Sequence, residues 1–521
     1  MTVPLFGFYP QSEFRVTEGR CRDCPTIAQA LWYFEAETIA VPKPGVPVAT
    51  FARGLDVAED LRLWLASRSP ENPPEYPQLV WVAAPQVVSG ARLSGDASTV
   101  ETADGVRRLE LVPKIALNRS YFDASSARFL HERTVKIRGV IESDAIVART
   151  LWPEDFRLDH TAPAHTLDST IPATLALRAL IRSDPRGGAQ EPFAVWSLWQ
   201  RDSARDALCP GRAALGLMLN GAQGDDDEAH GGHFALVTGL VQDDWAVGDW
   251  LTNNFYSLDI VSEKGIIAAP VTLDNYLADL NSGQNWYRPS HMLVAILRDA
   301  RAPSLLQAAL NRVYNQFWRH QLVYRHATMN CASISVDVLR WIGWDIPVRG
   351  SACRLLAVLA FPWFVVKERS IAKACTAFDY LWEDQTRLLP AAAFEEIGAS
   401  LVGLAKGASA QTARKAGLAQ MIAEDVDAIF LMRFPQFPSS RLFGDAPVAT
   451  PWEFQSRLPE VPQVVPVPDR PFPDALRDSD LRPPSRPPSA YAAAVWGTLL
   501  LVGIPILVYR LWCRWRARNA S

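Results

Sequence analysis

The chain has 521 residues, of which 49% are hydrophobic and 21% charged; this length favours two or three domains, and this composition excludes a disordered or fibrous protein. The 52 basic and 56 acidic side chains give a net charge of −4, which argues against nucleic acid as a partner because phosphate binding needs a basic surface. The seven cysteines are too few for a disulfide scaffold. We therefore expect a folded α+β protein of several domains.

Residues 1–165 are predicted to form a β-rich N-terminal domain. Short β-like segments alternate there with turn signals such as Ala103-Asp104-Gly105, a pattern typical of a small sheet. The expected strands are residues 78–82, 107–112 and 134–141, and the expected helix is residues 26–36. A linker at residues 159–164 should end this domain.

Residues 172–350 are predicted to form an antiparallel sheet with packed helices, because strand-like runs come first and helix-like runs follow. The expected strands are residues 194–199, 213–219, 233–241, 245–250, 255–260 and 292–297, and the expected helices are residues 304–324 and 332–342.

Residues 351–460 are predicted to be a helical region. Residues 355–366 form an apolar run interrupted by Pro362, which is too short to span a bilayer. This run is either a buried helix or an interfacial segment lying on a membrane. Residues 391–431 are expected to be ordinary amphipathic helix.

The C-terminal part is predicted to carry a membrane anchor. Residues 461–489 form a proline-rich linker, residues 490–509 contain no charge, and residues 510–521 form a basic tail. Twenty helical residues cover the ~30 Å hydrocarbon layer of a bilayer. We therefore expect a single-pass C-terminal transmembrane helix with membrane lipid as a partner.

The side of the membrane is less sharply indicated. The arginines of the tail favour a cytoplasmic C-terminus by the positive-inside rule. Residues 1–14 lack the basic and apolar regions of a secretory signal, which favours a cytoplasmic body. The two arguments conflict. We expect a cytoplasmic body, and the sequence does not decide which face of the membrane it lies on.

The candidate chemistry centres on His233 and Cys331. His233 opens a strand-like run after Gly231-Gly232, and Cys331 follows Asn330 directly before a helix-like run. With Asn330 as cap, Cys331 would lie in the first helical turn, where the helix dipole lowers the pKa of a thiol. A nearby imidazole would then form the thiolate–imidazolium pair of nucleophilic cysteine catalysis.

This arrangement resembles the circularly permuted papain-like superfamily, which includes the NlpC/P60 and lecithin:retinol acyltransferase-like proteins. The resemblance covers residues 211–343 and rests on Gly232-His233 with the strand behind it and on Asn330-Cys331 with the helix behind it. It implies that Cys331 is the nucleophile and His233 the general base. It also implies a third polar residue on the next strand, for which Asp249 is the best match, with Asn253 or Asn254 as substitutes.

Two other groups of residues carry weaker signals. Cys21 and Cys24 have the spacing of a redox disulfide or half a zinc site, but a structural disulfide or two inert thiols is the simpler interpretation. The acidic run 225–228 and His230 match no metal-binding spacing. We therefore expect no metal site and no cofactor.

Three hypotheses follow from these residues. The first is a membrane-anchored cysteine hydrolase or acyltransferase that acts on an amide or ester bond through Cys331, His233 and Asp249. Its substrate would be a peptide, a cell-wall peptide or a lipid, with no nucleic acid involved. The alternatives are a catalytically inactive, membrane-tethered binding or scaffold protein, and a thiol oxidoreductase that uses Cys21 and Cys24.

Overall fold

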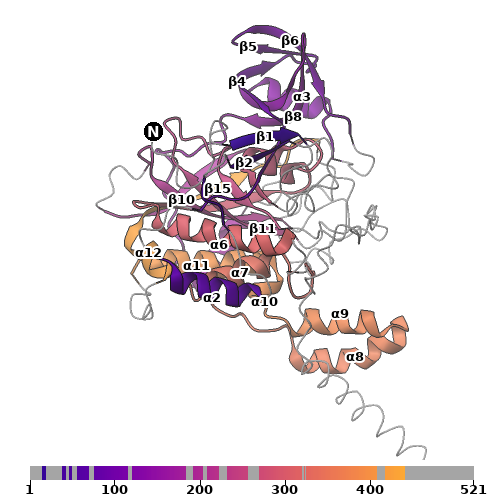
Figure 1. Ribbon diagram of the computed structural model, residues 1–521, viewed down its shortest axis with the longest axis vertical. Coiled ribbons are helices and arrows are strands. Elements are labelled where there is room, and N and C mark those ends of the chain that lie inside the picture. Colours follow the sequence, from indigo (N-terminus) through magenta and orange to yellow (C-terminus); the bar gives the residue numbers. More distant parts are fainter. Residues whose placement is uncertain are drawn as a thin grey trace, which may run out of the picture.

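The fold is α+β and is built around one large sheet (Figure 1). The computed structural model describes residues 14–18, 38–42, 46–49, 55–69, 75–114, 120–183, 192–202, 208–221, 232–255, 269–318, 322, 324–407 and 417–439.

The large sheet has ten strands in the order β1-β2-β3-β13-β12-β11-β10-β14-β15-β9, and neighbours are antiparallel except β13 and β3, which are parallel. The strand bounds are β1 (Phe14–Glu18), β2 (Thr38–Pro42), β3 (Val80–Ala83), β9 (Ala194–Gln200), β10 (Ala213–Asn220), β11 (His233–Leu240), β12 (Leu251–Asn253), β13 (Pro270–Thr272), β14 (Ser290–Leu297) and β15 (Val426–Phe434).

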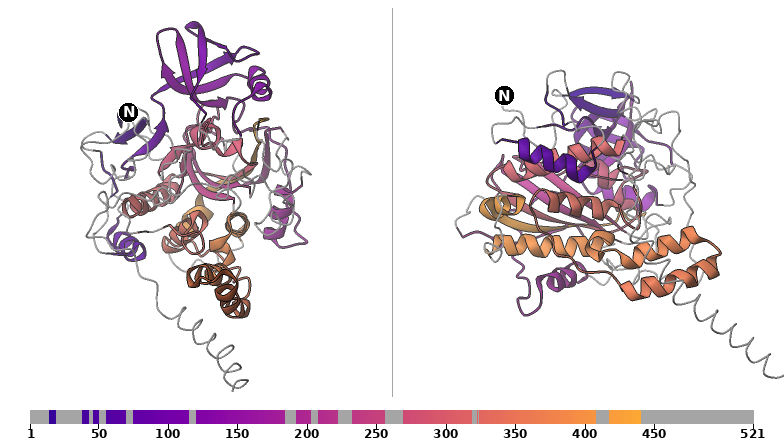
Figure 2. Two further views of the ribbon diagram at one scale, coloured as in Figure 1. Left: turned by 90° about the vertical axis from the view of Figure 1, so that its right-hand side faces the viewer. Right: turned by 60° about the horizontal axis from the view of Figure 1, so that its bottom comes forward.

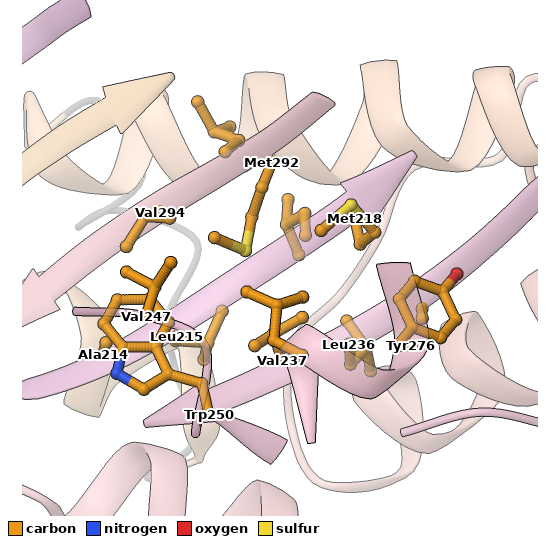
Figure 3. Packing of buried hydrophobic residues seen from close by; sticks show 14 of the residues in the cluster. Ala214, Leu215, Met218, Leu236, Val237, Val247, Trp250, Tyr276, Met292 and Val294 are labelled. Carbon is orange, nitrogen blue, oxygen red and sulfur yellow. The ribbon is translucent and has the colours of Figure 1, made fainter. Parts of the chain in front are cut away.

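The central strands are buried on both faces, which explains why they read as continuous apolar runs. Every residue of β10, β14 and β15 is buried. Figure 3 shows side chains of β10, β11 and β14 in one packed cluster, with the indole of Trp250 at one end and Tyr276 at the other. That indole lies over Gly239, where a Cβ would stand 2.2 Å from the ring Cγ, so only glycine fits at this position.

Helices cover one side of this sheet, and a barrel lies on the other side (Figures 1 and 2). The covering helices are α6 (Arg301–Trp318), α7 (Cys331–Trp341) and α11 (Pro390–Ala405). α6 and α7 pack against β11, and α11 packs against β10 and β15. The remaining helices of the described residues are α2 (Val57–Ser67), α3 (Ala124–His131), α4 (Ala173–Ile181), α5 (Leu273–Ala278), η3 (Gln284–Trp286), α8 (Arg354–Glu368), α9 (Ile371–Trp382), α10 (Gln385–Leu388) and α12 (Leu418–Asp425).

The barrel is a closed sheet with the strand order β4-β5-β6-β8-β7. Its strands are β4 (Gln86–Leu93), β5 (Thr99–Thr102), β6 (Gly105–Leu111), β7 (Val135–Ile141) and β8 (Ala145–Pro153). Ion pairs join it to the elements around the large sheet. The buried Arg138 guanidinium on β7 binds the buried Asp274 of α5 at 2.7 Å, and the partly exposed Asp249 just before β12 at 2.6 Å. The barrel and the sheet therefore pack as neighbours rather than as separate domains.

Two expectations about the N-terminal residues need correction. The predicted strands near residues 78–82, 107–112 and 134–141 exist as β3, β6 and β7, but β1 to β3 complete the large sheet instead of a separate domain. The segment 159–164 is not a free linker, since the Ser197 N–H donates to Pro163 O on the sheet edge. The predicted helix at residues 26–36 lies outside the described residues.

The C-terminal region is also less helical than expected. Instead of an amphipathic helix over residues 391–431, the chain forms α11, α12 and then β15. β15 lies between β14 and β9, so a strand from the predicted helical region completes the core of the sheet. The predicted strand 245–250 was also wrong: Trp245 has φ +59°, and the chain turns there before the short β12.

None of the helices in the described part of the chain is long and apolar enough to cross a membrane. The predicted single-pass anchor and the membrane localisation derived from it are therefore not borne out by the described residues. The linker 461–489, the predicted span 490–509 and the basic tail 510–521 lie outside the described residues.

Candidate functional site

Cys331 is the first residue of α7, and the predicted cap is confirmed. The Asn330 side chain accepts a hydrogen bond from Ser333 N at 2.9 Å, and the Ser333 hydroxyl accepts one from Asn330 N at 2.7 Å. This reciprocal capping box satisfies two backbone donors that a helix start otherwise leaves unpaired. It therefore fixes the backbone that carries the thiol.

A second set of contacts holds this helix start from the side of α10. The Asn330 amide donates to Leu388 O at 2.9 Å and to His326 O at 3.0 Å. Arg387 on α10 binds the Asp337 carboxylate of α7 with two hydrogen bonds of 2.8 Å. The position of Cys331 is thus set by α10 as well as by its own cap.

His233 is the first residue of β11 and lies opposite Asn220, the last residue of β10. Gly232 precedes it with φ +74°, a left-handed conformation that glycine adopts without steric cost. The ring of His233 is buried, and its Nε2 donates a hydrogen bond to Asn254 Oδ1 at 2.7 Å. This bond places the imidazole proton on Nε2 and leaves Nδ1 as the nitrogen that carries a lone pair.

The register of β11 and β12 explains why Asn254, and not Asp249, contacts the imidazole. Leu251 lies opposite Thr238 and Asn253 lies opposite Leu236, so the chain approaches His233 only after β12 ends. Asp249 precedes β12 and lies toward the far end of β11.

Asp249 is instead part of the contact between the barrel and the sheet. Its carboxylate binds Lys136 at 2.7 Å and Arg138 at 2.6 Å. Asn254, one of the two substitutes, therefore lies beside the imidazole, where Asp249 was expected. The other substitute, Asn253, pairs with Gln307 through hydrogen bonds of 3.0 and 3.1 Å.

The sulfur of Cys331 lies beside the first residues of β11. The backbone N–H groups of Phe234 and Ala332 and the phenol of Tyr324 lie close enough to this sulfur to lower the pKa of the thiol. Phe234 directly follows His233, so the fold brings the predicted nucleophile and base to the same end of one strand. The polar donors around the sulfur distinguish it from a thiol packed only among hydrocarbon side chains.

Burial governs the protonation of both groups. Burial raises the pKa of the Cys331 thiol, and the polar donors around its sulfur and the charge of Arg288 offset this only in part. Burial and the charge of Arg288 lower the pKa of His233 to about 3, although the hydrogen bond to Asn254 opposes this. At neutral pH the resting pair is therefore a thiol and a neutral imidazole, and not the expected thiolate–imidazolium pair.

Sequence reasoning missed three polar residues near this pair. Tyr324 contacts the thiol, and Arg288 acts on both titrating groups through its charge. The Tyr276 phenol donates to Asn220 Oδ1, and its ring centroid lies 6.1 Å from that of His233. None of these residues stands in a recognisable motif, because their proximity depends on the strand and helix packing.

The other candidate residues are not placed. Cys21, Cys24, the acidic run 225–228 and His230 lie outside the described residues. Among the residues that the structure describes, no group of three or more His, Cys, Asp or Glu side chains is arranged to hold a metal ion.

No protein-family model matches the chain, and comparisons with curated proteins and with solved structures give no match.

Proposed function

We propose that the protein is a cysteine-dependent acyl-transfer enzyme with Cys331 as nucleophile, His233 as general base and Asn254 as the residue that orients the imidazole. The observation that carries the proposal is the hydrogen bond from His233 Nε2 to Asn254 Oδ1 at 2.7 Å. The next residue of the strand, Phe234, has its N–H close to the Cys331 sulfur. A nucleophile, a base and a group that orients the base are the required parts of such a site.

The neutral resting pair is compatible with this chemistry. A neutral imidazole can accept the thiol proton through Nδ1 as the sulfur attacks the acyl carbon of an amide or ester. The S–C bond forms, the imidazolium returns the proton to the departing amine or alcohol, and a thioester remains on Cys331. Water, or an acceptor amine or alcohol, then attacks the thioester with His233 again as base, which releases the thiol.

The helix start supplies stabilisation for the developing oxyanion. The first N–H groups of an α-helix have no partner within the helix and point along its positive end. The Ser333 N–H is used by the cap, so the N–H of Cys331 itself is the donor that we assign to this role.

The substrate class follows from the reaction rather than from a bound ligand. An amide or ester is required, and a peptide, a cell-wall peptide or a lipid remain the proposed classes. The alternative of an inactive binding or scaffold protein is favoured by one observation: Cys331 and His233 are each only 4% exposed.

The test is formation of an acyl adduct with a generic activated ester, p-nitrophenyl acetate, followed by peptide mapping with mass spectrometry. We expect acetylation of Cys331 that depends on His233, and its loss in His233→Ala. The matched control is Cys353→Ser, which removes an exposed thiol but keeps an acceptor for the Leu356 N–H that Cys353 caps. An unmodified Cys331 in the folded wild-type chain would contradict the proposal and favour the scaffold alternative.

A further inference from the structure

The α8–α9 hairpin stands clear of the rest of the fold (Figures 1 and 2). The two helices pack on each other through a small core of their own, formed by Ala357, Phe361, Ala374 and Phe378. The turn between them passes through Arg369, which has φ +49°, and Ser370 caps α9 by accepting from Lys373 N. The hairpin is therefore a compact unit that already buries its inner face.

α8 carries a second apolar face on the outside. The residues of this outer stripe are Leu355 (68% exposed), Leu356 (49%), Leu359 (46%), Trp363 (54%) and Val366 (76%). Since an α-helix advances about 100° per residue, the five side chains fall within an arc of about 100°, opposite the arc of Ala357 and Phe361. A helix that is apolar on both sides is unusual on a water-exposed surface.

Basic residues border the outer stripe. The Lys367 ammonium lies 4.5 Å from the ring centroid of Trp363, and Arg369 follows the end of the stripe. The Arg354 guanidinium faces α9 instead, 5.3 Å from the ring centroid of Trp382. The only acidic residue of α8 is Glu368, which points away from the stripe and forms an ion pair with Lys373 at 3.1 Å. The exposed side of α8 thus combines apolar side chains and an exposed indole with positive charge alone.

We propose that the α8–α9 hairpin docks on an anionic lipid surface, with the outer stripe of α8 at the boundary between headgroups and acyl chains. A straight apolar row with an indole and flanking cations is the pattern of helices that lie in a bilayer interface. Lys367 and Arg369 complement the phosphate of anionic headgroups. From Leu355 to Val366 the row is about 16 Å long at 1.5 Å per residue, so the helix lies along the surface and does not cross it.

This docking is independent of the chemistry at Cys331 and of any segment outside the described residues. The apolar run 355–366 was expected as a buried or an interfacial helix, and its outer exposure favours the interfacial alternative. A protein partner or a second copy of the chain would also cover apolar surface, so the experiment must separate these occupants from lipid.

The experiment is hydrogen exchange of the full chain with mass spectrometry, with and without vesicles of phosphatidylcholine and phosphatidylglycerol. Because the readout is local, binding elsewhere in the chain does not obscure it. We expect severalfold slower amide exchange in peptides covering α8 and α9. Peptides of β6 should be unchanged, although Val106 on that strand is 69% exposed.

The decisive variant is Leu359→Glu with Trp363→Glu, which leaves the inner core of the hairpin intact. Loss of two inserted side chains should raise the lipid concentration for half-maximal slowing roughly a hundredfold, whereas Val106→Glu should leave it unchanged. Absence of slowing on the mixed vesicles, equal slowing on phosphatidylcholine alone, or an unchanged lipid concentration for half-maximal slowing in the double variant would overturn the proposal. Slowing that follows protein concentration without lipid would instead assign the outer stripe to self-association.

Discussion

Replacing Asn254 by alanine removes the acceptor of the His233 Nε2 hydrogen bond, which is 2.7 Å long. The imidazole is buried, so its N–H would lose a partner where water does not replace it, at a cost of about 1–3 kcal/mol. If that energy holds the ring in the orientation needed for proton transfer, acylation of Cys331 should slow by about 10- to 100-fold. The rate of adduct formation from p-nitrophenyl acetate measures this effect, and urea denaturation measures the accompanying loss of stability.

The neighbouring Asn253 provides a matched control. It is equally buried, but its amide pairs with Gln307 and with Leu236 O rather than with the imidazole. Asn253→Ala should therefore lower the free energy of unfolding by a similar amount and leave the rate of acylation near that of the wild type. The reasoning is refuted if Asn254→Ala acylates at the wild-type rate, or if both variants slow acylation equally.

Three further predictions concern stability, each measured by urea denaturation. Burial lowers the pKa of His233 and His291 to about 3 from the usual 6.5, so as the pH falls the unfolded chain takes up a proton at each histidine before the folded chain does. The free energy of unfolding should therefore be full above pH ~6.5 and lower at pH 5 by about 2 kcal/mol per histidine. His291→Gln should remove about half of that loss. Arg138→Met removes one of two cations from the contact between barrel and sheet, because Lys136 also binds Asp249 and Asp274, and should cost about 1.5–3 kcal/mol. The exposed ion pair of Arg108 should cost under about 1 kcal/mol when Arg108 is replaced by alanine; equal losses would contradict the account of this contact. Gly239→Ala drives a Cβ to 2.2 Å from an indole carbon and should destabilise the sheet by at least about 1–3 kcal/mol, so an unchanged unfolding midpoint would show that the ring moves freely.

The parts of the fold that the sequence predicted well are those with strong local signals. The runs at 213–219 and 233–241 are nearly identical to β10 and β11, since apolar β-rich segments bounded by glycine form buried strands. The start of α7 at Cys331 was also predicted, because Asn330 is a favourable cap.

The missed parts depend on distant contacts. β15 follows a helix directly and is buried along its whole length, so its apolar residues show no alternation that would separate strand from helix. β3 joins the large sheet through a parallel pairing with β13, which lies far away in the sequence. Local patterns do not encode either pairing.

The third residue of the site shows the same limit. Asp249 and Asn254 lie five positions apart in one segment, and Asp249 was chosen as the best match by position. The choice depended on the register of β12 against β11 and on the two cations of the barrel that bind Asp249. The protonation states were missed for a related reason, because burial of Cys331 and His233 appears only when the chain is folded.

The central claim is that Cys331, His233 and Asn254 act as one unit, and a double-mutant cycle on the acylation of Cys331 tests it most directly. If Asn254 acts only by orienting the imidazole, Asn254→Ala has nothing left to disturb once His233 is alanine. The account predicts that His233→Ala alone slows acylation strongly and that the double variant has the same rate as His233→Ala. A wild-type rate in His233→Ala, or a further independent loss in the double variant, would contradict it.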